Sequence, residues 1–177
     1  MSQAEKEDID VLFATGWETA YPVFNMKNPA HKMYFVQDFE PLFYGMGSKA
    51  VLAENTYRFG FYGITAGCWL TKKVGEYGMK ADFFDFGADL DIYRPTEKTP
   101  KKKQICFYAR PVTERRAFEI GVLTLTKFHQ MHPDYNIVFF GWDVSDYDIP
   151  FPYENRGIIS PAELSSIYHD PQACLVL

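Results

Sequence analysis

Cysteine is scarce in this chain, and the cysteines that are present form none of the usual patterns. Three occur among 177 residues, far apart from one another, at Cys68, Cys106 and Cys174. An odd number without a C-x-x-C pair predicts neither a disulfide framework nor a zinc site. We therefore expect three small buried hydrophobic side chains, no bound metal, and a reduced, cytoplasmic protein.

Long apolar runs and a surplus of basic residues are missing too. No run approaches the roughly 18 apolar residues that a membrane-spanning helix needs, and the polar, acidic opening MSQAEKEDID is unlike a signal peptide. Peripheral attachment at the inner face of a membrane is compatible with both observations. The net charge of −5 argues against nucleic acid as the main partner, because phosphate backbones recruit strongly basic surfaces.

Common nucleotide-binding and catalytic motifs are absent as well. The chain has no P-loop, no G-x-G-x-x-G sequence and no Ser-His-Asp order. It is instead rich in apolar and aromatic residues, which is enough to form a packed core: 47% of its residues are hydrophobic, with 16 Phe, 12 Tyr and 3 Trp. We interpret most of the aromatic residues as core, with sugar or partner stacking as the alternative.

One break in composition divides the chain. The segment 95–103, PTEKTPKKK, has two prolines, four lysines and no large apolar residue, and we interpret it as an exposed linker. Short apolar runs in the segment before it, 1–94, predict strands at 10–15, 32–36, 63–66 and 82–86. The pattern also predicts helices over 48–61 and 70–78.

The segment after the linker, 104–177, has a clearer pattern. Its apolar runs predict strands at 104–108, 136–140 and 173–177, with helices over 114–131 and 160–168. The second helix begins with a capping box, in which Ser160 and Glu163 flank a proline at the first helical position. Continuously apolar strands that alternate with helices predict a parallel α/β sheet. Because the chain opens like a middle strand and stops inside a strand, we expect parts of two Rossmann-like domains, both incomplete.

Several long stretches resemble the family-4 glycosyltransferases of the GT-B fold. In the second segment these are QICFYARP, TERRAFEIGVLTLTKF, HPDYNIVFFG and GIISPAELSSIYHDPQACLVL. In the first segment ATGWETAYPVF, YFVQDFEPLFY, MGSKAVLAENTYRFGFYGITAG and FGADLDIYRP resemble a bacterial branch linked to rhamnose-rich surface polysaccharides.

The resemblance implies a function and a separate substrate for each of the two domains. Residues 1–94 would be the second half of an acceptor-side domain, and residues 104–177 the first half of a nucleotide-sugar domain. The complete enzyme would transfer a sugar from a nucleoside-diphosphate sugar to a glycan acceptor with retention of configuration, and without a metal or other cofactor.

The chain also departs from that family. The first βα units and a motif of two glutamates eight residues apart, which holds the donor sugar, have no counterpart here. An inactive Rossmann-like binding module is therefore the alternative function. Unpaired strand edges would then recruit partners, and we expect self-association through such edges.

Three arginines are the sharpest candidates for binding chemistry. Arg110 follows the strand 104–108, and Arg115 and Arg116 are expected in the first turn of the next helix. Guanidinium groups beside a helix N-terminus form a diphosphate clamp, because both attract anions. The resemblance implies the same role for Arg110. A solvated helix start with surface ion pairs to Glu114 or Glu119 is the alternative.

Two further groups of residues follow predicted strands. Gln37, Asp38 and Glu40 come after the strand 32–36, at the end where α/β proteins bind ligands, and are candidates for the acceptor-side cleft. Gly141 and Trp142 follow the strand 136–140, and the resemblance places this loop near the nucleotide. A turn bonded to its own backbone and an ordinary surface loop are the respective alternatives. The catalytic residue stays unassigned.

Overall fold

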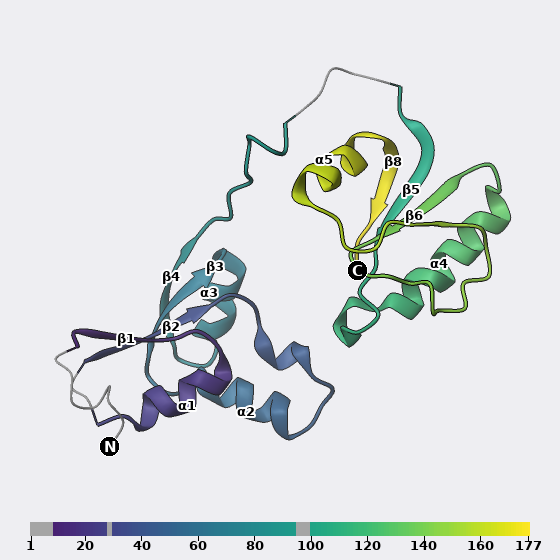
Figure 1. Ribbon diagram of the computed structural model, residues 1–177. Coiled ribbons are helices and arrows are strands. Elements are labelled where there is room, and N and C mark those ends of the chain that lie inside the picture. The colour runs from purple at the N-terminus through teal and green to yellow at the C-terminus, as the bar shows by residue number, and fades with distance from the viewer. Residues whose placement is uncertain (1–8, 28–29, 95–99) are drawn as a thin grey trace. The chain divides into compact units, whose positions relative to one another are not determined.

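The structure consists of two compact α/β units. The computed structural model (Figure 1) describes residues 9–27, 30–94 and 100–177. The units comprise residues Met1–Gly87 and Ala88–Leu177, and each contains a four-stranded sheet in which all pairs of strands are parallel. The predicted fold class, α/β with two Rossmann-like sheets, is confirmed.

The predicted linker overlaps a strand. Its residues 95–99 lie outside the described part of the chain. Lys102 and Lys103, expected in a solvated connector, are instead the first residues of strand β5. Their ammonium groups pair with the carboxylates of Asp170 and Asp134, respectively.

The first unit is a simple succession of strands and crossovers. Its sheet has the order β1-β2-β3-β4, so each strand lies beside the next strand in the chain. The elements are β1 (Val11–Ala14), α1 (Trp17–Asn25), β2 (His31–Val36), the 3₁₀ turn η2 (Glu40–Phe43), α2 (Ser48–Thr56), β3 (Tyr62–Ala66), α3 (Cys68–Gly75) and β4 (Lys80–Phe84).

One face of this sheet is packed and the other is more open. Successive side chains of a strand point to opposite faces. Ala14, Tyr34 and Val36 are therefore directed to one face, where they form a single core with residues of α1 and α3. On the other face Val11 and Phe13 are exposed.

The helices between β1 and β3 differ in two respects from those that the sequence predicts. The helix α1 was not expected, and it contains Pro22, a residue that removes a backbone donor and normally ends a helix. The predicted helix 48–61 ends at Thr56, because the chain then turns and Gly60 takes a positive φ of 76° before β3 begins.

The second unit is doubly wound. Its sheet has the order β7-β6-β5-β8. Its elements are β5 (Lys102–Tyr108), η3 (Glu114–Arg116), α4 (Phe118–Met131), β6 (Asn136–Phe140), β7 (Glu154–Asn155), α5 (Pro161–His169) and β8 (Pro171–Leu175). The capping box at α5 is confirmed, since the Ser160 hydroxyl accepts from the Glu163 amide and the Glu163 carboxylate accepts from the Ser160 amide.

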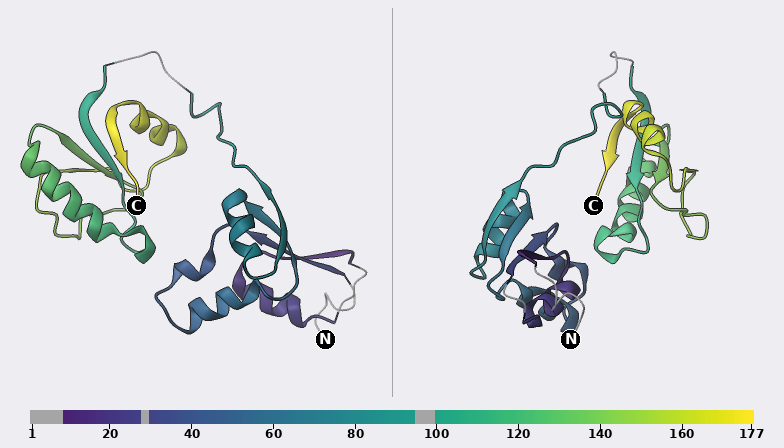
Figure 2. Two further views of the ribbon diagram at one scale, coloured as in Figure 1. Left: turned by 180° about the vertical axis from the view of Figure 1, so that it is seen from behind. Right: turned by 60° about the vertical axis from the view of Figure 1, so that its left-hand side comes forward.

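The two long helices of this unit cover opposite faces of its sheet (Figure 2). Phe107 and Phe139 are directed to α4, where they pack with Phe118. The alternating residues Cys106 and Phe140 belong to a second core beneath α5. Covering both faces explains why these strands are continuously apolar.

The strand order defines a switch point in this sheet. From β5 the chain passes to β6 on one side, and it returns to the other side of β5 as β8. Crossovers in opposite directions leave a crevice at the carboxyl ends of the two strands where the direction changes, and open α/β sheets bind their ligands there. The carboxyl ends of β5 and β8 are therefore the expected ligand-binding edge of this unit.

Candidate functional site

Arg110 lies at this edge, two residues after β5 ends. Its Nη1 donates a 3.0 Å hydrogen bond to the hydroxyl of Tyr108. Its Nε is buried and has no hydrogen-bond partner. In the described part of the chain, no carboxylate forms a salt bridge with Arg110. A buried donor without a partner is costly, so this guanidinium is suited to bind an anion.

The prediction that Arg115 and Arg116 sit in the first turn of the following helix is wrong. The two residues belong to the separate 3₁₀ turn η3. Ala117 then takes a left-handed conformation with φ 43°, and α4 begins only at Phe118. Local bonds of η3 explain the break, since the amides of Arg116 and Ala117 donate to the carbonyls of Thr113 and Glu114.

Tyr108 brings two of the three arginines together. Besides accepting from Arg110, its ring lies 5.7 Å from the guanidinium carbon of Arg116, within the range of a cation–π interaction. Arg115 is exposed. We did not anticipate a role for Tyr108, because it reads as an ordinary strand residue. Its alternation with Phe107 could only have indicated that it lies on the α5 face.

Gly141 gives the Tyr108 ring its space. It follows β6 with φ 102°, and a Cβ at this position would lie 2.6 Å from the tyrosine ring and 3.0 Å from the carbonyl oxygen of Ala109. The structure therefore places Gly141 beside Tyr108. The next residue, Trp142, is half-buried. The loop that follows is held by Asp143, whose carboxylate accepts from Ser145 and Asn155.

The acceptor-side candidates lie at the carboxyl end of β2 but differ in their surroundings. Gln37 is exposed, whereas Asp38 accepts a 2.8 Å bond from the Phe39 amide within its own turn. Glu40 is only 5% exposed. Its carboxylate accepts a 2.6 Å bond from the backbone amide of Trp17, the first residue of α1. Glu40 thus acts as a distant cap for that helix, whose own N-cap residue is a glycine.

A group of polar and aromatic side chains lies beside Glu40, with Glu18 exposed and Trp17 and Tyr44 half-buried. The indole Nε1 of Trp17 donates to the Tyr44 hydroxyl over 3.0 Å, and that hydroxyl donates to the Glu18 carboxylate over 3.3 Å. Ring faces together with acceptor oxygens are the groups with which proteins bind sugars. The sequence signal that could have found this group is the pair Trp17-Glu18, which follows β1 after two residues, at the ligand-binding end of the strand.

The surroundings of Glu40 predict a pH dependence of stability. Burial is the main cause that raises the pKa of its carboxyl above the ordinary value of 4.5, with smaller contributions from the charges of Glu18 and Asp38. A carboxyl with a raised pKa binds its proton more tightly in the folded state, so its contribution to stability declines as pH rises from 4.5 through the folded pKa. Glu40→Gln should remove this decline.

Urea unfolding from pH 4 to pH 8, at about one-unit steps, would measure the effect as a difference between wild type and variant. Glu163→Gln is the matched control with the opposite sign, because hydrogen bonds from Ser160 lower the pKa of Glu163 and its contribution is lost as pH falls. Parallel curves for wild type and the Glu40 variant would contradict the prediction.

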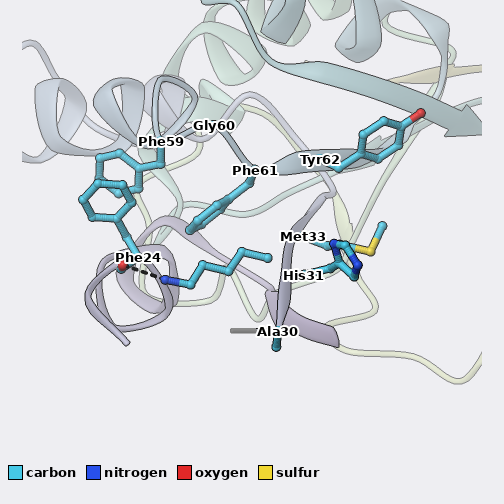
Figure 3. A pocket seen from close by; sticks show the side chains of 9 residues that line it. Phe24, Ala30, His31, Met33, Phe59, Gly60, Phe61 and Tyr62 are labelled. Carbon is cyan, nitrogen blue, oxygen red and sulfur yellow. Dashed lines mark hydrogen bonds between the residues drawn. The ribbon is translucent and has the colours of Figure 1, made fainter. Parts of the chain in front are cut away.

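A hollow of about 660 Å³ lies at the other end of the first sheet (Figure 3). It is lined mainly by aromatic side chains, with Phe24 stacked on Phe59 at 4.3 Å. The ammonium of Lys32, on its wall, donates to the carbonyl oxygens of Phe24 and Met26 and so stabilises the end of α1. The hollow lies at the amino ends of β2 and β3, opposite the edge where ligands of α/β sheets bind.

Within the described ranges no three His, Cys, Asp or Glu side chains gather as metal ligands. No helix among the same residues is long and apolar enough to cross a membrane.

The chain is similar to known proteins over most of its length. Residues 3–66 match the family described as WsaF, N-terminal domain. Over 168 residues the chain is 33% identical to the O-antigen biosynthesis protein RfbC of Myxococcus xanthus, an alignment that covers 91% of this chain and 13% of that protein. The chain is therefore similar to a polysaccharide-biosynthesis protein, and it spans about an eighth of that relative's length.

Proposed function

We propose that this chain is part of a glycosyltransferase of the GT-B kind, which transfers a sugar from a nucleoside-diphosphate sugar to a cell-surface polysaccharide. The similarity to an O-antigen biosynthesis protein supports the polysaccharide as product. The observation that carries the donor site is Arg110, with its unpartnered Nε, at the switch point of a doubly wound sheet. We place the reaction in the cytoplasm, where nucleotide sugars are available.

The arginines would act on the leaving group. Charge accumulates on the diphosphate as its bond to the sugar breaks, and donors fixed in advance stabilise that charge in the transition state. Arg110 retains donors for phosphate oxygens, because within the described residues its Nη1 alone donates a hydrogen bond, to Tyr108. Arg116, whose guanidinium lies over the Tyr108 ring, would add a second positive charge.

The first unit would hold the glycan acceptor. Gln37 and the group formed by Trp17, Glu18 and Tyr44 lie at the carboxyl ends of β1 and β2. Glu40 supports this site indirectly by fixing the start of α1, and it is too buried to contact a glycan itself. Self-association through the edge strand β8 and attachment to a membrane surface stay predictions.

We expect no measurable sugar transfer by the isolated chain. In the family that the chain resembles, two glutamates eight residues apart hold the donor sugar, and no pair in this sequence matches them by position. Positioning of both substrates supplies up to about 7–11 kcal/mol of a transfer reaction's barrier. An assay of the purified chain with UDP-, GDP- and dTDP-sugars and glycan acceptors measures this, and clear turnover would contradict it.

Binding of the leaving group separates this proposal from its alternative. The isolated chain should still bind a nucleoside diphosphate, because the arginines belong to the second unit alone. Titration with UDP, GDP and dTDP by calorimetry measures that binding. No binding of any of the three would favour an inactive binding module instead.

A further inference from the structure

Two of the three free cysteines are neighbours in the second sheet, although they are far apart in sequence. In the parallel pairing of β5 with β8, Cys106 lies directly opposite Cys174. The prediction of three buried cysteines holds for Cys106 and is wrong for Cys68 and Cys174, which are exposed. Cys68, on α3 of the first unit, has no such neighbour among the described residues.

Both thiols point to the same face of the sheet. Residues paired across a parallel ladder share a face, and Cys106 belongs to the core beneath α5. The proximity of the two thiols is the main cause that raises the pKa of Cys106 and lowers the pKa of Cys174. Cys174 is the exposed member of the pair, whereas Cys106 is buried and its thiol donates to the carbonyl oxygen of Ala173 over 3.8 Å.

The spacing of the strands permits a disulfide, but a strained one. Neighbouring strands lie about 4.8 Å apart, within the Cα separation of about 4.4–6.8 Å seen for disulfides. The Cβ atoms of residues directly opposite each other keep a similar spacing, whereas a relaxed disulfide needs about 3.5–4.5 Å. Because β8 is an edge strand with an irregularity in its pairing with β5, it can move closer than a central strand could.

We propose that Cys106 and Cys174 form a reversible redox site whose co-substrate is a small-molecule disulfide such as oxidised glutathione. Cys174 is exposed, so its thiolate attacks a sulfur of that disulfide, and one glutathione thiolate leaves. The buried Cys106 then loses its proton and attacks the sulfur of Cys174, which releases the second glutathione thiolate. Two protein thiols are oxidised and one glutathione disulfide is reduced to two thiols.

The strained geometry makes this bond a labile one. Strained disulfides are reduced more easily than structural ones, so a surplus of reduced glutathione should open it again. Closing it ties the edge strand β8 to the central strand β5, two residues before Tyr108. The proposal rests on the strand register and does not depend on the function proposed above.

The test uses the purified chain with Cys68→Ser, incubated with increasing ratios of oxidised to reduced glutathione. After acid quenching, denaturation and alkylation, mass spectrometry identifies each cysteine's state. We expect the loss of both alkylatable thiols together, the appearance of a peptide pair joined through Cys106 and Cys174, and recovery of both thiols when the ratio is reversed.

Two variants sharpen the result. Cys106→Ala should leave Cys174 as a stable glutathione adduct, and Cys174→Ser should leave Cys106 reduced. In the Cys68→Ser chain, a lasting glutathione adduct on Cys174 with Cys106 still reduced at every ratio would overturn the proposal, as would disulfides that only join two chains. If the Cys106 variant fails to fold, the parent chain and the Cys174 variant still decide between these outcomes.

Discussion

Replacing Gly121 with alanine is expected to destabilise the second unit by about 1–3 kcal/mol, the range for overpacking a core. A Cβ at this position of α4 would lie 2.1 Å from Cζ of Phe107 and 2.6 Å from its Cε1. That ring is fully buried, stacked on Phe118 and in edge contact with Phe139. It cannot move aside without displacing other core residues, so the helix itself would have to shift away from β5.

Gly75→Ala is the matched control for this substitution. Gly75 is exposed in α3, and nothing lies within 4 Å of the Cβ that alanine would add. Alanine is the better helix former, so this variant should gain up to about 0.5–1 kcal/mol. Urea unfolding followed by hydrogen exchange of peptides from α3 and α4 separates the two units. Equal stability of the Gly121 variant and wild type would show that α4 does not pack on Phe107 this closely.

The strands could be predicted from the sequence because their apolar character is continuous. NIVFF gives a five-residue strand within its predicted bounds, Asn136–Phe140, since both faces of the sheet are covered and its four apolar side chains are all buried. The start of α5 could be predicted for a different reason, because the bonds of its capping box are local to Ser160 and Glu163. Features that depend on residues close together in sequence could therefore be predicted.

What could not be predicted depends on residues distant in sequence or on single backbone angles. The helix α1 contains Pro22, and the carboxylate at its first amide comes from Glu40 in another loop. Ala117 interrupts the predicted helix 114–131 through one left-handed residue, for which alanine gives no signal. The strand β7 consists of Glu154 and Asn155, which show no apolar pattern.

In the candidate site, too, features local in sequence could be predicted and contacts between distant residues could not. Arg110 could be singled out because it follows a strong apolar strand, which fixes the edge of the sheet at which it lies. The Tyr108 contacts to Arg110 and Arg116, and the space that Gly141 leaves, arise between separate loops. No local pattern encodes such contacts.

Arg110→Ala should weaken binding of a nucleoside diphosphate by about 1.5–3 kcal/mol, the range for hydrogen bonds that involve a charged group. That is roughly a 10- to 150-fold rise in Kd, since each 1.4 kcal/mol is a factor of ten. The reason is geometric, because Arg110 offers its unpartnered Nε and its remaining Nη2 at the switch point of the sheet. Calorimetric titration of the chain with UDP and dTDP measures the change.

Two substitutions serve as controls for this measurement. Arg58→Ala removes the same charge from the first unit, where Arg58 pairs with Glu54 over 3.4 Å, and should leave Kd unchanged. Tyr108→Phe keeps the ring but removes the hydroxyl that holds Nη1, so it should cost about 0.5–1.5 kcal/mol, the net range for one hydrogen bond. The Tyr108→Phe variant should bind the nucleoside diphosphate more weakly than wild type. Its free energy of unfolding in urea should stay near that of wild type, because the ring keeps its packing on Phe140. If both Arg110→Ala and Arg58→Ala bind UDP as tightly as wild type, the diphosphate lies elsewhere and Arg110 has no part in holding it.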